Sequence, residues 1–100
     1  SRKGLHYATA KGGLDTMTVA LSKFGAPHGI LVNSVRCGVI DSGMYLKIPG
    51  YTENNYLRRV AGVPLGRSGR PEEVAGLVTF LAGTGGDFIT GQIIDIAGGD

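Results

Sequence analysis

The sequence lacks the features on which several classes of protein depend. Its single cysteine, Cys37, excludes an internal disulfide and suits a reducing compartment, which we take to be the cytoplasm. No stretch approaches the ~20 apolar residues of a membrane-spanning helix, and the first six residues lack the apolar core of a signal peptide. The net charge is only +2 and no long block of lysine and arginine is present, so we expect neither a membrane nor a nucleic acid as partner.

Apolar residues and glycine are plentiful. Hydrophobic residues make up 42% of the 100 residues and charged residues 18%, which indicates a chain that buries surface and is not a disordered tail. The 18 glycines predict many tight turns and close backbone approaches. His6, His28 and Asp41 do not have the spacing of metal ligands, so we expect no metal site.

A long amphipathic helix is predicted to follow a polar lead-in of residues 1–6 and to end at Gly25-Ala26-Pro27. Its apolar residues recur at spacings of 4, 3, 4 and 3, which is one helical stripe. We expect this stripe to pack on a sheet. Its members are Ala10, Leu14, Met17, Leu21 and Phe24.

Tyr7 and Lys11 lie four residues apart at the head of this helix. That spacing places them on neighbouring turns, roughly 5–6 Å apart at Cβ. The ammonium of Lys11 favours the phenolate, so Tyr7 should lose its proton more easily than a free tyrosine. A tyrosine of this kind can give or take a proton at a carbonyl or alcohol oxygen. The same pattern occurs by chance in many helices, so its meaning depends on the motifs in the rest of the chain.

Two strands and a second long helix are predicted after it. Residues 30–35 and 92–96 are short, β-branched and apolar, as in buried strands, and Arg36-Cys37-Gly38 is predicted as the turn after the first strand. The helix opens at Arg70-Pro71-Glu72-Glu73, where a proline and two acidic residues suit a helix N-terminus. We expect its buried face to consist of Val74, Leu77, Val78 and Leu81.

Residues 38–70 form a long irregular segment that we interpret as a lid. Thr52 is predicted to cap a short helix that carries Tyr56, Leu57 and Val60 inward. A lid is favoured over a solvated linker because apolar side chains are scattered through the segment. These are Met44, Tyr45, Leu46, Ile48 and Tyr51.

The alternation of helices and strands predicts a parallel α/β sheet with right-handed crossovers. Ligands bind beyond the carboxyl ends of such strands, so Tyr7, Lys11 and residues 37–42 are expected to line one site. Two strands alone make a poor parallel sheet, because each needs neighbours on both edges. We therefore expect residues 1–100 to be the second half of a larger domain.

Four segments together resemble the short-chain dehydrogenase/reductase family. Residues 7–14 resemble its active-site helix, and residues 30–44 resemble a strand and the turn that comes after it. Residues 64–75 are similar to the segment before its last long helix, and residues 90–99 to its final strand. The closest group is the 3-oxoacyl-carrier-protein reductase-like members, together with sugar- or polyol-dehydrogenase-like ones. The resemblance implies the C-terminal portion of a doubly wound, parallel-sheet Rossmann-type domain whose N-terminal cofactor-binding half is absent.

The resemblance also implies an activity, which is hydride transfer between NAD(H) or NADP(H) and a small carbonyl/alcohol substrate. Tyr7 would be the general acid/base, and Lys11 would hold the nicotinamide ribose hydroxyls and assist the tyrosine. Residues 43–62 would be the substrate lid, and a homotetramer or homodimer would be the assembly. Contacts to the cofactor would come from Tyr7, Lys11, Cys37, Gly38, the backbone of Ile40 and the hydroxyl of Ser42.

The chain departs from the family pattern in several places. The family's catalytic serine, catalytic asparagine and Gly-rich cofactor turn are absent, and Cys37 replaces the usual proline. A second hypothesis therefore stays open, in which these residues are a non-catalytic truncated or proteolytic fragment that self-associates through exposed apolar helix faces.

Overall fold

The computed structural model describes residues 2–43 and 47–100, and it begins with a single long helix. Helix α1 runs Arg2–Gly25, so the expected polar lead-in is wrong from residue 2 onward. Arginine, lysine and leucine are good helix formers, which accounts for the early start. The predicted end is confirmed: a 3₁₀ turn (Ala26–His28) comes next, and Gly29 takes the left-handed conformation with a φ of 71°.

The sheet has two parallel strands, as predicted, with β1 spanning Ser34–Cys37 and β2 spanning Ile93–Ile96. The first strand was predicted too early, because residues 30–33 have no strand beside them. Loop contacts hold them instead: the Val32 amide donates to Thr90 Oγ1 (3.0 Å), and Asn33 Nδ2 donates to the Ile89 carbonyl (2.9 Å). Arg36 and Cys37, expected in a turn, are the last two residues of β1.

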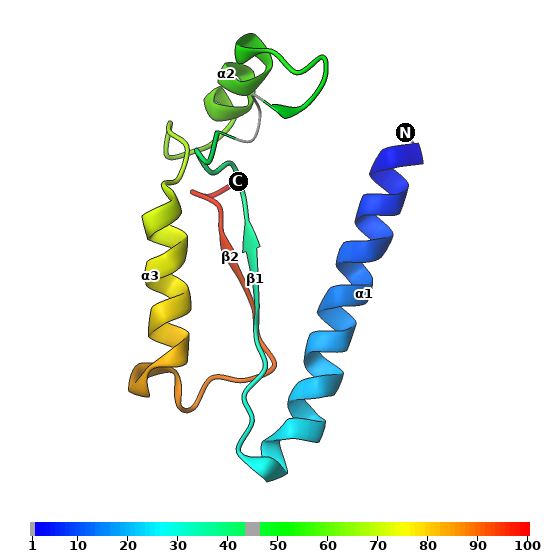
Figure 1. Ribbon diagram of the computed structural model, residues 1–100, viewed down its shortest axis with the longest axis vertical. Coiled ribbons are helices and arrows are strands. Elements are labelled where there is room, and N and C mark those ends of the chain that lie inside the picture. The colour runs from blue at the N-terminus through cyan, green and yellow to red at the C-terminus, as the bar shows by residue number, and fades with distance from the viewer. Residues whose placement is uncertain (1, 44–46) are drawn as a thin grey trace.

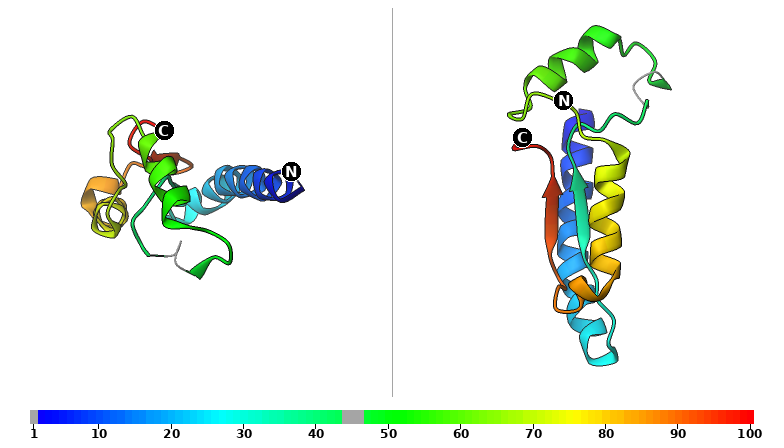
Figure 2. Two further views of the ribbon diagram at one scale, coloured as in Figure 1. Left: turned by 90° about the horizontal axis from the view of Figure 1, so that it is seen from above. Right: turned by 90° about the vertical axis from the view of Figure 1, so that its left-hand side faces the viewer.

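Helices lie on both sides of this sheet (Figure 1, and Figure 2 at the left). Helix α3 (Pro71–Ala82) connects the lid to β2 on one side, and α1 lies on the other. Of the predicted buried face of α3, Val74, Leu77 and Leu81 are only half-buried. The prediction is wrong for Val78, which is 50% exposed.

The side of α1 that faces the sheet is polar, which contradicts the expected packing. Thr18 and Ser22 are buried, at 4% and 5% exposure, whereas the predicted apolar stripe is open to solvent. A charged residue of the sheet explains why the polar side of α1 faces it, because the Arg36 side chain pairs with Asp15 of α1. The buried hydroxyls are satisfied within the helix, since Thr18 donates to the Leu14 carbonyl and Ser22 to the Val19 carbonyl.

The lid contains the short helix that the sequence predicts, α2 (Glu53–Ala61). Thr52 caps it, because its Oγ1 accepts a hydrogen bond from the Asn55 amide at 3.2 Å. Tyr56 and Val60 are half-buried as expected, but Leu57 is 54% exposed and does not point inward. The lid side chains assigned to Met44, Tyr45 and Leu46 lie outside the described residues.

The molecule is more open than a compact chain of its size. Its accessible surface is 7329 Å², whereas a compact protein of 10.4 kDa exposes about 5,400 Å². The radius of gyration is 15.9 Å, against about 13 Å for a compact chain of this length. Among the described residues the buried apolar side chains are only Val39 and Val63. The helices and sheet therefore leave large apolar faces uncovered.

Candidate active site

Tyr7 and Lys11 occupy successive turns of α1, near the end that lies beside the carboxyl ends of the strands (Figures 1 and 2). The Lys11 ammonium lies 5.4 Å from the centroid of the Tyr7 ring, within the range of a cation–π contact. Tyr7 is 65% exposed and Lys11 is half-buried. The phenol is therefore accessible to a ligand, with a positive charge beside it.

A hollow of about 320 Å³ lies between α1 and the ends of the two strands. It brings Tyr7 and Lys11 together with Cys37 and Gly38, which the sequence assigned to the same site. A phenol, an ammonium and backbone amide groups thus border one space, a set that suits a ligand carrying hydroxyl and amide groups. The remaining lining residues are Arg36, Asp95, Ala97 and Asp100.

Ile40 and Ser42 line a second hollow of about 290 Å³, which shares Cys37 and Gly38 with the first. Its other walls come from the lid and are Val39, Ile48, Tyr51, Tyr56 and Arg59. The structure thus divides the predicted cofactor-binding residues between two adjoining spaces that have Cys37-Gly38 as their common wall. One space borders the Tyr7–Lys11 pair, and the other is apolar and aromatic with a single arginine.

The turn after β1 is held by backbone hydrogen bonds on both sides. The Gly38 amide donates to the Ile96 carbonyl at 3.0 Å, which ties the turn to β2. The Gly69 amide donates to the Val39 carbonyl, and the Asp41 amide donates to the Gly69 carbonyl, both at 2.8 Å. A Cβ at position 69 would lie 2.7 Å from Ile40 Cδ1, the end of a side chain that can rotate aside, so the backbone hydrogen bonds are what hold the turn at this position. The position of the turn therefore does not depend on the side chain of Cys37.

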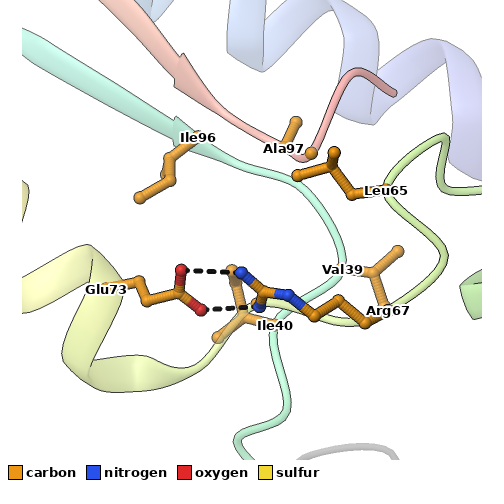
Figure 3. Close-up of a pocket in the computed structure, with 9 residues that line it drawn as sticks. Val39, Ile40, Leu65, Arg67, Glu73, Ile96 and Ala97 are labelled. Carbon is orange, nitrogen blue, oxygen red and sulfur yellow. Dashed lines mark hydrogen bonds and ion pairs between the residues drawn. The ribbon is translucent and has the colours of Figure 1, made fainter.

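An ion pair fixes the segment that carries Gly69, and Figure 3 shows it at the edge of a small cavity of about 140 Å³. Arg67 Nη1 and Nη2 donate to the two carboxylate oxygens of Glu73 at 2.7 and 3.0 Å. The Arg70 amide also donates to Glu73 Oε1, at 3.0 Å. The hydrogen bonds from Arg67 and then from the Arg70 amide lower the pKa of Glu73 to about 2. The sequence alone assigned no role to this pair.

A second charged cluster, also missed, borders the hollow beside Tyr7. Arg36 on β1 lies opposite Asp95 on β2 and donates to both of its carboxylate oxygens, from Nε at 2.6 Å and from Nη2 at 2.9 Å. Its Nη1 donates to Asp15 Oδ2 on α1 at 3.2 Å. The hydrogen bonds from Arg36 lower the pKa of Asp95, and those from Asp95 raise the pKa of Arg36. The sequence did contain a signal for this cluster, because each of two otherwise largely apolar strands carries one charged residue, and the two charges are of opposite sign.

Two kinds of feature are absent from residues 2–43 and 47–100. No three His, Cys, Asp or Glu side chains in these ranges are grouped so that they could hold a metal ion. No helix in the same ranges is long and apolar enough to cross a membrane.

The sequence matches known reductases over almost its whole length. Residues 2–100 fit the family model of enoyl-(acyl carrier protein) reductase. The chain is 42% identical over 94 residues to 3-oxoacyl-(acyl-carrier-protein) reductase FabG of Chlamydia trachomatis, which covers 94% of this chain and 37% of the relative. It is 41% identical over 95 residues to acetoacetyl-CoA reductase of Rhizobium meliloti, covering 95% of this chain and 39% of the relative. The chain thus spans well under half the length of these curated relatives.

Two solved structures share the fold of this chain over most of its length. A blue fluorescent protein from a metagenomic library, solved in complex with NADPH, superposes with a TM-score of 0.80 and 35% identity, covering 93% of this chain and 36% of that one. A protein of Thermus thermophilus superposes with a TM-score of 0.81 at the same 35% identity, covering 93% and 38%.

Proposed function

Because the chain belongs to the short-chain dehydrogenase/reductase family, we propose that it forms the catalytic-helix and lid half of an oxidoreductase with a single Rossmann-type domain. The full-length protein transfers a hydride between NAD(H) or NADP(H) and a carbonyl/alcohol substrate. The observation that carries the proposal is the placement of the Lys11 ammonium 5.4 Å from the Tyr7 ring, in one hollow with the turn after β1.

The residues around this hollow fit a nicotinamide nucleoside. Lys11 carries three donors, which match the ribose hydroxyls. The turn after β1 borders this hollow at Cys37 and Gly38 and continues through Ile40 and Ser42 along the adjoining one, and the backbone amide and carbonyl groups of the turn match a carboxamide. Hydrogen bonds from β2 and Gly69 hold that backbone in place. These fixed groups would orient the cofactor with one face toward Tyr7.

Tyr7 acts as the general acid in reduction and as the general base in oxidation. A bound nicotinamide supplies or accepts the hydride. Tyr7 Oη donates its proton to the carbonyl oxygen of the substrate, which becomes the alcohol hydroxyl. The ammonium of Lys11, 5.4 Å from the centre of the Tyr7 ring, assists this step.

The second hollow suits the substrate. Tyr51 and Tyr56 give it aromatic walls, and Arg59 supplies one positive charge near its edge. An acyl chain with a keto group would lie along the aromatic walls, with that group toward Tyr7. The relatives are named as reductases of 3-oxoacyl and acetoacetyl thioesters, and this substrate class is the one we propose.

A second candidate concerns the 100 residues by themselves. The large accessible surface, 7329 Å², includes exposed apolar faces. In this second candidate, those faces are covered by the preceding half of the domain or by a second copy of the chain. We expect the isolated chain to be inactive, to bind neither NADH nor NADPH, and to self-associate. Tight cofactor binding by the isolated chain would contradict this.

The proposed function is tested with Lys11→Met in the full-length protein, assayed with NADPH, NADH and acetoacetyl-CoA. Lys23→Met is the matched control, because Lys23 is an exposed lysine on the same helix at its other end. Loss of the charged hydrogen bonds to the ribose should raise KM for the cofactor about tenfold or more, and the control should match the wild type. Equal kinetics for both variants would refute the role of Lys11.

A further inference from the structure

Asp15 places a carboxylate one helical turn from Lys11, on the side of α1 that faces the sheet. Residues four apart on a helix are close enough to pair. Asp15 is only partly exposed, with a side-chain exposure of 27%. Its Oδ1 is buried, and within the described part of the chain it has no hydrogen-bond partner. Asp15 is therefore a competitor for the ammonium that the cofactor requires.

Arg36 occupies the other oxygen of that carboxylate. It donates from Nη1 to Asp15 Oδ2 at 3.2 Å, while its Nε and Nη2 are held by Asp95 at 2.6 and 2.9 Å. Two parallel hydrogen bonds to one carboxylate fix the plane of a guanidinium, so the third donor has a defined direction. Arg36 thus joins β2, β1 and α1 at the border of the hollow that contains Tyr7 and Lys11.

We propose that Arg36 is a positioning residue that keeps Asp15 paired to the sheet and so leaves the Lys11 ammonium free for the cofactor. The inference rests on the proposed function, because it concerns the availability of Lys11 to a nicotinamide ribose. Arg36 itself does not act on the reacting atoms. Its removal frees the Asp15 carboxylate to pair with Lys11, which then binds the ribose hydroxyls less well.

A purely structural role for Arg36 makes a different prediction. If Arg36 only fastened α1 to the sheet, removing Asp15 would break the same link and be as harmful as removing Arg36. If Arg36 instead withholds Asp15 from Lys11, removing Asp15 is harmless and repairs the loss of Arg36. A pair of single variants and their combination therefore separates the two roles.

The experiment measures the Kd for NADPH and NADH, with kcat and KM, in the full-length wild type and in Arg36→Met, Asp15→Asn and the double variant. Arg36→Met should raise the cofactor Kd roughly two- to tenfold, the range between an exposed helix pair and a hydrogen bond to a charged group. At saturating cofactor its kcat should stay near the wild-type value. Asp15→Asn should bind cofactor like the wild type, and the double variant should bind it more tightly than Arg36→Met, although the loss of Arg36 leaves Asp95 unpaired in both.

Several results would overturn the inference: an unchanged Kd in Arg36→Met, a loss in Asp15→Asn equal to that in Arg36→Met, or a double variant no better than Arg36→Met. If Arg36→Met does not fold, Arg36→Lys takes its place, since it keeps the charge but cannot hold both carboxylates, and its smaller loss must also be reversed by Asp15→Asn. A wild-type protein that binds neither nucleotide refutes the proposed function itself. If the wild type binds cofactor but the variants do not differ in Kd as described, only the role of Arg36 is refuted.

Discussion

Gly38 is the residue at which the backbone tolerates least change beside the proposed cofactor. A Cβ built at this position would lie 2.8 Å from Ala97 Cβ and 2.9 Å from Ala97 Cα. The two backbone segments must separate by about 0.6–1 Å before these atoms reach ordinary contact. The Gly38 amide donates to the Ile96 carbonyl at 3.0 Å, so the separation also stretches the last hydrogen bond between β1 and β2.

We therefore predict that Gly38→Ala destabilises the full-length protein and weakens cofactor binding. Overpacking of this kind costs about 1–3 kcal/mol, and because backbone and Cβ atoms cannot rotate away, we expect the upper half of that range. Denaturant unfolding followed by circular dichroism measures the loss of stability. Titration with NADPH measures the weakened binding, since Gly38 borders both hollows.

Gly12→Ala is the matched control, because it makes the same chemical change one residue after Lys11. A Cβ at position 12 meets nothing within 4 Å, and alanine stabilises a helix interior by about 1 kcal/mol relative to glycine. The two substitutions should therefore change the free energy of unfolding in opposite directions. Equal effects of both, or a Gly38→Ala protein as stable as the wild type, would show that the contact with Ala97 does not limit this position.

Single contacts give three other predictions. The pKa of Glu73, about 2, lies below its ordinary value of 4.5, so its pairing with Arg67 stabilises the fold above pH 4.5 and is lost as the pH falls through 2. Acid titration of Glu73→Gln should show a smaller loss of stability across this window, and an unchanged titration curve would count against the pairing. Thr52→Ala removes the cap of α2 and should destabilise that helix by about 1 kcal/mol, seen as faster amide exchange in α2 but not in α3. Cys37→Pro should leave the cofactor Kd unchanged, because Arg36 is already extended and Gly38 and Gly69 hold the turn; a large rise in Kd would contradict this.

The order of elements and the parallel pairing of the strands were predictable from local patterns. The resemblance of the four segments to the short-chain dehydrogenase/reductase family is confirmed by a family-model match over residues 2–100. Periodicity of 3.6 residues marks a helix, and proline and glycine mark its ends, so α1, α3 and the end of α1 at Gly25 could be predicted directly.

The packing of α1 was not predictable, because periodicity shows which residues share a face of a helix but not what that face packs against. Lys11, Asp15, Thr18 and Ser22 recur at spacings of 4, 3 and 4, as regularly as the apolar stripe. Which stripe meets the sheet depends on the strand residues opposite, and Arg36 favours the polar one. The apolar stripe is then left for a neighbour outside the described chain. The shift of β1 has a similar cause, since residues 30–33 lack a partner strand.

The candidate site also has a part that was predictable from the sequence and a part that was not. Tyr7 and Lys11 are four residues apart, so their proximity results from helix geometry alone. Arg36 and Asp95 are separated by 59 residues, and Arg36 and Asp15 by 21. Only the register of β1 on β2 and the side on which α1 packs bring these charges together.

Proton transfer by Tyr7 is the step on which the proposed function depends, and Tyr7→Phe in the full-length protein tests it. The measurement is the single-turnover rate of cofactor oxidation with substrate, alongside the cofactor Kd, with Lys23→Met at the other end of α1 as the control. We predict that Tyr7→Phe loses at least about a hundredfold in rate and keeps a cofactor Kd near the wild-type value. A Tyr7→Phe protein that turns over at a rate close to the wild type would contradict the assignment of Tyr7 as the general acid/base.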